Sequence, residues 1–135
     1  MKDLATIIRM NEKAVEMFEV AHEEKSPVTL KYDNKIIYRL YIGKNDMESG
    51  KQELTDNYFI DTVSDTLQEN EINGFTMLEA IGYWKGKQEK TLVIEIVLND
   101  CKTSEKAITN TVETLKKYFR QESIMVTKNH IEVAF

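Results

Sequence analysis

The amino-acid sequence predicts an α+β fold, in which two helices cover one face of an antiparallel sheet. Two patterns predict it: apolar residues that alternate with polar ones, as in strands, and apolar residues at three- and four-residue steps, as in helices. The chain has 135 residues, which fits one compact domain of about 100–150 residues. Its hydrophobic fraction of 41% supplies a core and excludes general disorder.

The first predicted element is an amphipathic helix over residues 3–24. The residues that share its stripe are Leu4, Ile8, Asn11, Val15, Phe18 and His22. Ser26-Pro27 ends the helix, because the residue before a proline disfavours the helical conformation. We therefore divide the chain into an N-terminal helix (residues 1–26) and a single α+β domain (residues 27–135). The helix docks either on the domain or on another subunit, where a polar seam residue such as Asn11 would fix the register.

A β-hairpin is predicted next, with strands over residues 28–32 and 35–42. Asp33-Asn34 would form its turn, since both residue types tolerate the positive φ of tight turns. One face of the second strand carries Ile36, Tyr38, Leu40 and Ile42, and the other carries Ile37, Arg39 and Tyr41. Contact-forming residues on both faces predict a core on one side and a helix, a partner or a ligand on the other.

Two further helices and a strand pair follow. Thr55 or Asp56 is expected to cap a helix that runs to about residue 70, with a buried stripe of Phe59, Val63 and Leu67. The clearest strand pair covers residues 75–84 and 91–98, with Gly86 at the centre of its turn. Ser104 is expected to cap the next helix. The buried stripe of that helix would consist of Ile108, Val112, Leu115 and Phe119.

The chain finishes in strands over residues 124–127 and 130–135, for which a hairpin across Lys128-Asn129 is one arrangement. After the N-terminal helix and the β-hairpin, the element order is β-α-β-β-α-β. This is the ferredoxin-like split βαβ arrangement. Its sheet has one open face, which small proteins of this shape commonly bury by self-association. We therefore predict a homo-oligomer.

Composition and charge exclude several classes of function. The chain has 18 Lys+Arg and 23 Asp+Glu, hence a net charge of −5, whereas non-specific nucleic-acid binding needs a basic surface. No apolar run approaches the roughly 20 residues that span a bilayer, and the first residues lack the features of a signal peptide. The only cysteine, Cys101, cannot form an internal disulfide. We predict a cytoplasmic protein with neither nucleic-acid nor membrane partners.

No motif selects a catalytic, metal or cofactor site. The sequence contains no G-x-x-x-x-G-K-[ST], no G-x-G-x-x-G and no closely spaced histidine or cysteine pair. His22 is interpreted as a residue near a helix end, His130 as a partly exposed strand residue and Cys101 as a free thiol without function. We therefore predict a protein that is not an enzyme, with no catalytic residues, no metal and no cofactor. If the chain were an enzyme, His130 would be its candidate base.

Residues suited to ligand binding gather in two places. Trp84 and Lys85, at the strand turn, combine a π face with a cation, as nucleobase and phosphate recognition requires. At the end of the last helix, the Arg120 guanidinium can make a two-pronged contact with phosphate. Gln121 and Ser123 can bind hydroxyls or base edges. The structural alternatives are an interfacial tryptophan at the turn and a helix cap with surface charges at residues 120–123.

Arg39 and Phe75 complete the candidate binding residues. A strand-centre arginine on a largely apolar face needs an anionic partner, which is either a ligand or a protein carboxylate. Phe75 follows Gly74 and can either stack on a ligand or pack in the core.

The chain from Tyr38 onward resembles a bacterial ferredoxin-like domain family of unknown function. Three segments carry this resemblance: YRLYIG at residues 38–43, GFTMLEA at 74–80 with Gly82 and Trp84, and Phe119 with QES at 121–123. The resemblance supports the predicted fold and implies no activity.

The whole chain also resembles the phage Thoeris anti-defence sponges of the first type, in size, acidity, element order and the surroundings of Arg39, Trp84 and Arg120. This resemblance implies an oligomer that binds cyclic ADP-ribose-type signalling molecules without cleaving them, so that the host immune effector stays inactive. Low-nanomolar affinity requires a binding free energy of about 12 kcal/mol, which is more than one exposed patch normally provides. We therefore expect an enclosed, basic pocket with an aromatic floor, formed between subunits.

Two other functions stay open from the sequence. One is a protein-interaction module whose opening helix binds a host protein, in which case deletion of residues 1–25 would remove function and leave the sheet domain folded. The other is a small enzyme on a ferredoxin-like scaffold, which predicts turnover of its ligand.

Overall fold

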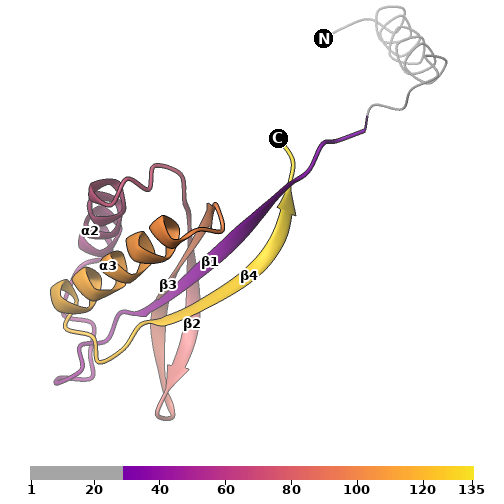
Figure 1. Ribbon diagram of the computed structural model, residues 1–135. Helices are drawn as coiled ribbons and strands as arrows, with labels where there is room; N and C mark the ends of the chain where they lie inside the picture. Colours follow the sequence, from indigo (N-terminus) through magenta and orange to yellow (C-terminus); the bar gives the residue numbers. More distant parts are fainter. Residues whose placement is uncertain (1–28) are drawn as a thin grey trace, which may run out of the picture. The chain divides into compact units, whose positions relative to one another are not determined.

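The structure is a computed structural model that describes residues 29–135 (Figure 1). Its elements, in chain order, are β1 (Asp33–Gly43), α2 (Asp56–Glu69), β2 (Thr76–Trp84), β3 (Lys87–Leu98), α3 (Lys102–Tyr118) and β4 (Met125–Val133). All of them lie in one compact unit, Asp33–Val133. The β-α-β-β-α-β order confirms the predicted ferredoxin-like core. The predicted N-terminal helix lies outside the described residues.

The four strands form one sheet in the order β2-β3-β1-β4, and every neighbouring pair is antiparallel. Helices α2 and α3 cover the same face of this sheet, as Figure 1 shows. Side chains alternate between the two faces of a strand, so every second residue of β1 points to the helices. These residues, Ile36, Tyr38, Leu40 and Ile42, are buried as predicted. Within residues 29–135, neither helix covers the opposite face of the sheet, which we call the open face.

The core lies between this sheet and the two helices. The apolar stripe of α2, Phe59, Val63 and Leu67, is fully buried as predicted. Phe59 packs on Phe119, with 4.4 Å between the ring centroids. The Tyr38 hydroxyl donates a hydrogen bond to Glu105 Oε1 at 3.0 Å, and burial with this carboxylate raises the pKa of Tyr38 to about 12. Neither helix of the described residues is long and apolar enough to cross a membrane.

The helix starts agree with the sequence at α2 and differ at α3. Thr55 caps α2, because its side-chain oxygen accepts a hydrogen bond from the backbone N–H of Tyr58 at 3.1 Å. Such a cap contributes about 1 kcal/mol. The prediction that Ser104 caps α3 is wrong. The N-cap is Cys101, whose backbone is still extended after β3, and Ser104 is buried in the first turn, with its Oγ 3.3 Å from Cys101 Sγ.

The two hairpins predicted at Asp33-Asn34 and Lys128-Asn129 are absent. Asp33-Asn34 begins β1 and pairs with the end of β4, and Lys128-Asn129 lies within β4 opposite the centre of β1. Residues 29–32 form no strand. Asp, Asn and Lys tolerate a turn but do not require one, and the ladder between β1 and β4 decides their conformation. The turn around Gly86 is confirmed, although β3 begins at Lys87, earlier than predicted.

Lys44, the residue after β1, has a fully buried side chain. Its Nζ lies 2.8 Å from both carboxylate oxygens of Glu79 on β2 and 3.1 Å from Asp56 Oδ1 at the start of α2. The same atom lies 5.7 Å from the centroid of the Phe59 ring. A buried ammonium group is costly unless it is paired. These contacts therefore fix the point at which the loop after β1, residues 45–54, leaves the sheet.

Acid is expected to destabilise this junction. The pKa of Asp56 is lowered from 3.8 to about 2, because Gln52 donates a hydrogen bond to its carboxylate and Lys44 lies beside it. A carboxylate with a depressed folded-state pKa adds stability above its unfolded pKa, and this contribution is lost as the pH falls through its folded pKa. We expect Asp56→Asn to reduce the loss of stability between pH 3.8 and about 2 in urea unfolding curves.

Asp65→Asn, which changes an exposed carboxylate of the same helix, is the matched control. Equal acid sensitivity in the two variants would contradict the assignment to Asp56.

Candidate ligand-binding site

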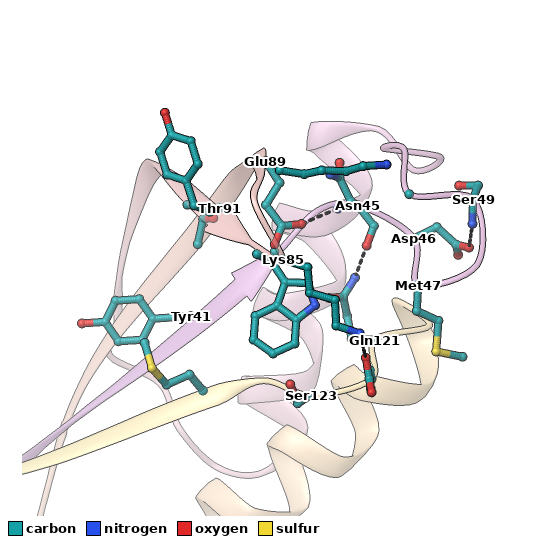
Figure 2. A pocket seen from close by; sticks show the side chains of 18 of the residues that line it. Tyr41, Asn45, Asp46, Met47, Ser49, Lys85, Glu89, Thr91, Gln121 and Ser123 are labelled. Carbon is teal, nitrogen blue, oxygen red and sulfur yellow. Dashed lines mark hydrogen bonds and ion pairs between the residues drawn. The ribbon is translucent and has the colours of Figure 1, made fainter.

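A pocket of about 740 Å³ opens at one end of the sheet, where three connections meet (Figure 2). Its walls come from the loop after β1 (residues 45–50), the turn between β2 and β3, and the loop before β4 (residues 121–123). Strand residues on the sheet face opposite α2 and α3 close it from below. The volume falls in the range of small-molecule sites, roughly 300–1,000 Å³.

The floor of the pocket is shaped by two glycines on either side of β3. Gly43 of β1 pairs with Thr91, and Gly82 of β2 pairs with Glu89. A Cβ on Gly43 would lie 2.3 Å from Glu89 Oε1, and a Cβ on Gly82 would lie 2.5 Å from Thr91 Oγ1. The side chains of Glu89 and Thr91 therefore lie across the two glycines. The missing side chains at Gly43 and Gly82 make room for Glu89 and Thr91 on the floor of the pocket.

Asn45 connects the floor to the far wall. Its backbone N–H donates to Glu89 Oε2 at 3.1 Å, and its carbonyl oxygen accepts from Gln121 Nε2 at 2.9 Å. Both bonds are drawn in Figure 2. The next residue, Asp46, accepts from the backbone N–H groups of Ser49 and Glu48, which lower the pKa of its carboxyl. The loop is thus folded on its own polar groups, and Gln121 is held in place.

Four of the predicted binding residues line this one pocket: Trp84, Lys85, Gln121 and Ser123. The fold therefore brings together the two places that the sequence singled out. Arg120 lies beside the pocket rather than in its lining. Its Nε is 3.3 Å from Asp46 Oδ1 and its Nη2 is 2.7 Å from Glu48 Oε2. Both carboxylates belong to the pocket wall.

Arg39 and Phe75 do not line the pocket. Arg39 Nε donates to Glu95 Oε2 at 2.7 Å, on the neighbouring strand of the open sheet face. This is the protein carboxylate that the sequence left open as an alternative to a ligand. Phe75 is partly buried and packs against the core.

The charge of the pocket differs from the basic lining expected from the sequence. Its walls carry four carboxylates, those of Asp46, Glu48, Glu89 and Glu122, against the lysines Lys85 and Lys87. Lys85 Nζ lies 3.7 Å from Glu122 Oε2, and both side chains are largely exposed. The acidic loop after β1, which carries Asp46 and Glu48, accounts for this difference. The site therefore offers hydrogen-bond acceptors as well as cations.

The two cations predicted to bind phosphate stand on unfavourable backbone. Lys85 has φ 51° and Gly86 has φ 78°, as in a type I′ turn. Arg120, which follows the C-cap Phe119 of α3, has φ 52°, and the next N–H, that of Gln121, donates to Lys116 O at 3.0 Å. Glycine and asparagine adopt this left-handed backbone more readily than lysine or arginine does. Strained residues that gather at one pocket are typical of functional sites.

Lys85→Asn is expected to stabilise the hairpin, by up to about 1 kcal/mol, because asparagine suits the first position of this turn. Loss of the exposed contact to Glu122 costs little. The same variant should bind a phosphate-bearing ligand more weakly. Urea unfolding and calorimetric titration measure the two effects. A destabilised variant would contradict the predicted strain at Lys85, and a variant that binds as tightly as the wild type would remove Lys85 from the site.

The candidate reactive residues lie outside the pocket lining. His130 Nδ1 is 3.9 Å from Asp100 Oδ2, and both side chains are exposed. Hydrogen bonds from Ser104 lower the pKa of the exposed Cys101 thiol. His22 lies outside the described residues. Within residues 29–135, no group of three His, Cys, Asp or Glu side chains could hold a metal ion.

Sequence reasoning missed Glu89, Lys44 and the acidic loop. The signal that could have pointed to Glu89 is a pair of glycines, Gly43 and Gly82. Each is the single glycine of its strand. Without the register of β3, nothing in the sequence shows that both glycines flank one glutamate.

Comparison with known proteins gives a family and a fold. Residues 37–135 match the family described as "Protein of unknown function (DUF3574)". The chain belongs to this family. The DUF3574 region contains every residue that lines the pocket, and it coincides with the resemblance seen from Tyr38 onward. None of the curated proteins matches the sequence.

Two solved structures share the fold of this DUF3574 domain. CPII, a nitrogen regulatory PII-like protein from Thiomonas intermedia K12 bound to ADP, AMP and bicarbonate, is 13% identical with a TM-score of 0.52, covering 78% of this chain and 98% of its own. A phage SAM lyase in complex with S-methyl-5′-thioadenosine is 15% identical with a TM-score of 0.51, covering 75% of this chain and 90% of its own. At these identities the likeness concerns the fold alone.

Proposed function

We propose that this DUF3574 protein binds an adenine-nucleotide-type small molecule in the pocket and holds it without cleaving it. One observation carries the proposal: an aromatic face (Trp84), a cation (Lys85) and two polar groups (Gln121 and Ser123) line a single cavity of about 740 Å³. Base stacking on tryptophan, phosphate on lysine and hydrogen bonds to base edges are the contacts that such a ligand makes.

The structural neighbours are compatible with nucleotide binding. CPII is bound to ADP and AMP, and the phage SAM lyase holds S-methyl-5′-thioadenosine. Arg120 extends the same chemistry, because a ligand phosphate can replace the largely exposed carboxylate of Glu48 beside its guanidinium.

Retention without cleavage is supported by the character of the lining. Among the described residues, those that line the pocket include no histidine or cysteine. The candidate base His130 and the thiol of Cys101 therefore have no direct access to a ligand there. An enzyme on the same scaffold remains the alternative, and it predicts an altered ligand.

The finer proposal follows from the resemblance to phage sponges. The ligand is then a cyclic ADP-ribose-type signalling molecule, and its sequestration in the host cytoplasm keeps a host immune effector inactive. Such a ligand offers an adenine for stacking on Trp84 and a pyrophosphate for Lys85 and Arg120.

The test is calorimetric titration of the full chain with glycocyclic ADP-ribose isomers, followed by recovery of the ligand after heat denaturation. Saturable binding with the ligand recovered intact supports sequestration. Recovery of a chemically altered ligand would identify an enzyme in place of a sequestering protein. The absence of any heat of binding would overturn the finer proposal.

A variant pair ties any binding to the pocket. Trp84→Ala should weaken binding by roughly 10- to 100-fold, as loss of one stacked base does. Tyr118→Ala removes an equally exposed aromatic side chain outside the pocket lining and should leave affinity unchanged.

We further propose that a second copy of the chain covers the open sheet face. Leu78, Val97 and Met125 are exposed on this face, and Met125 also lines the pocket, so a covering copy would add a pocket wall. Light scattering should show an oligomer that Leu78→Lys with Val97→Lys dissociates. Ile81→Lys, at an exposed residue on the opposite face of β2, is the control. A monomeric wild type would contradict this proposal.

A further inference from the structure

We infer that Glu89 selects the ligand by its ribose, accepting hydrogen bonds from the two neighbouring hydroxyls of the sugar. The inference rests on the proposed function, since it assumes that a nucleotide occupies the pocket. The family description and the sequence pattern give no role to this carboxylate on the pocket floor.

Glu89 differs from the other three carboxylates that line the pocket. Asp46 and Glu48 are paired with Arg120, and Glu122 lies near Lys85. Among the described residues, Glu89 has no cation partner. Its Oε2 accepts one backbone N–H, that of Asn45, and no described residue donates to Oε1. An ionised carboxylate only accepts hydrogen bonds. Glu89 therefore has unused acceptor capacity inside a cavity.

The position of this carboxylate is imposed by the sheet. Glu89 Oε1 lies where a side chain on Gly43 would begin, 2.3 Å from that Cβ position. Only a glycine there lets the glutamate lie across β1. The Asn45 backbone N–H then fixes the carboxylate in that orientation. Such an arrangement places a half-buried acceptor on the pocket floor, held before any ligand arrives.

The chemistry of this acceptor favours a vicinal diol. A carboxylate repels a phosphate at the same point, whereas it binds hydroxyl donors strongly, and acidic side chains recognise the ribose hydroxyls of bound dinucleotides in this way. The cations lie elsewhere, on the β2–β3 turn and at the end of α3. The floor is thus suited to ribose, and the rim to phosphate.

Titration with two probes tests the inference: adenosine 5′-monophosphate and its 2′,3′-dideoxy form. The wild type should prefer the ribose form by at least about tenfold, the effect of one lost hydrogen bond to a charged group. Glu89→Gln, which keeps the shape of the side chain, should lose most of this preference and still bind the dideoxy form. Glu122→Gln changes a carboxylate of the same pocket and should keep the preference.

Gly43→Ala separates the position of the carboxylate from its charge. The added methyl group displaces the flexible end of Glu89 and leaves its charge in place. We expect a folded protein, by its thermal melting curve, with the ribose preference reduced.

The outcomes distinguish this inference from the proposed function. Equal binding of both probes to the wild type, or an unchanged preference in Glu89→Gln, overturns the role of Glu89 and leaves nucleotide binding standing. Binding of neither probe overturns the inference together with binding of simple adenine nucleotides.

Discussion

Arg120→Ala is expected to weaken binding of a phosphate-bearing ligand by on the order of 100-fold, which corresponds to about 2.7 kcal/mol. The guanidinium presents a planar fork to the phosphate, which the compact charge of a lysine such as Lys116 or Lys117 in the last turn of α3 does not reproduce. The melting temperature should stay close to that of the wild type. The Arg120 side chain is about half exposed in its contacts to Asp46 and Glu48, and ion pairs of exposed side chains contribute little to stability. Asp46 keeps the backbone N–H groups of Glu48 and Ser49 as partners.

Arg120→Gly provides a matched variant. Both substitutions remove the guanidinium, but glycine suits the left-handed backbone at φ 52° better than alanine does, by about 1 kcal/mol. Arg120→Gly should therefore be the more stable of the two and equally defective in calorimetric titration. Affinity that survives in either variant would remove Arg120 from the site. If Arg120→Ala were the more stable of the two variants, residue 120 would not adopt the positive φ on which this prediction rests.

Glu79→Gln is expected to destabilise the protein more than Lys44→Met does. Removing Glu79 leaves the buried ammonium of Lys44 with Asp56 alone. Breaking a buried pair in this way costs roughly 3–5 kcal/mol. We expect roughly 2 kcal/mol here, because Glu79 is about half exposed and because Asp56 remains. Lys44→Met removes the buried charge itself, water solvates both carboxylates, and the loss should stay below about 1 kcal/mol.

Urea unfolding of the two variants measures this difference. Glu113→Gln, which changes an exposed carboxylate paired with Lys116 on α3, is the control and should change the free energy of unfolding by less than about 0.5 kcal/mol. If Lys44→Met were the most destabilised of the three, the lysine would act through its packing on Phe59 and not through its charge.

The parts of the fold that follow from periodicity were predictable from the sequence. The alternation from Ile36 to Ile42 and the helical stripe around Val63 describe faces that must be buried, and the structure buries them. The turn at Asp33-Asn34 was wrong for a physical reason. Those residues permit several conformations, and pairing with the end of β4, about a hundred residues later in the chain, selects the extended one.

Part of the candidate site was likewise predictable from the sequence, and part was not. Trp84 and Lys85, like Gln121 and Ser123, were found from residue chemistry, because aromatic and cationic side chains beside a turn suggest ligand contacts in any fold. Glu89 was not found, because its role depends on which residues of β1 and β2 lie opposite it. The charge of the pocket also depends on a loop whose folding over the site cannot be read from its composition.

The sheet order has a consequence for the newly made chain. β1 is the first strand of the domain to be synthesised, and its two neighbours in the sheet are β3 and β4, which come after α2 and β2. At about 5–20 residues per second, β1 waits for seconds with both edges unpaired. Its apolar stretch from Ile36 to Ile42 is then open to pairing with other nascent chains. Arg39 is the only charge within that stretch. Before Arg39 meets Glu95, we expect its charge to oppose such pairing, as gatekeeper residues do in other aggregation-prone strands.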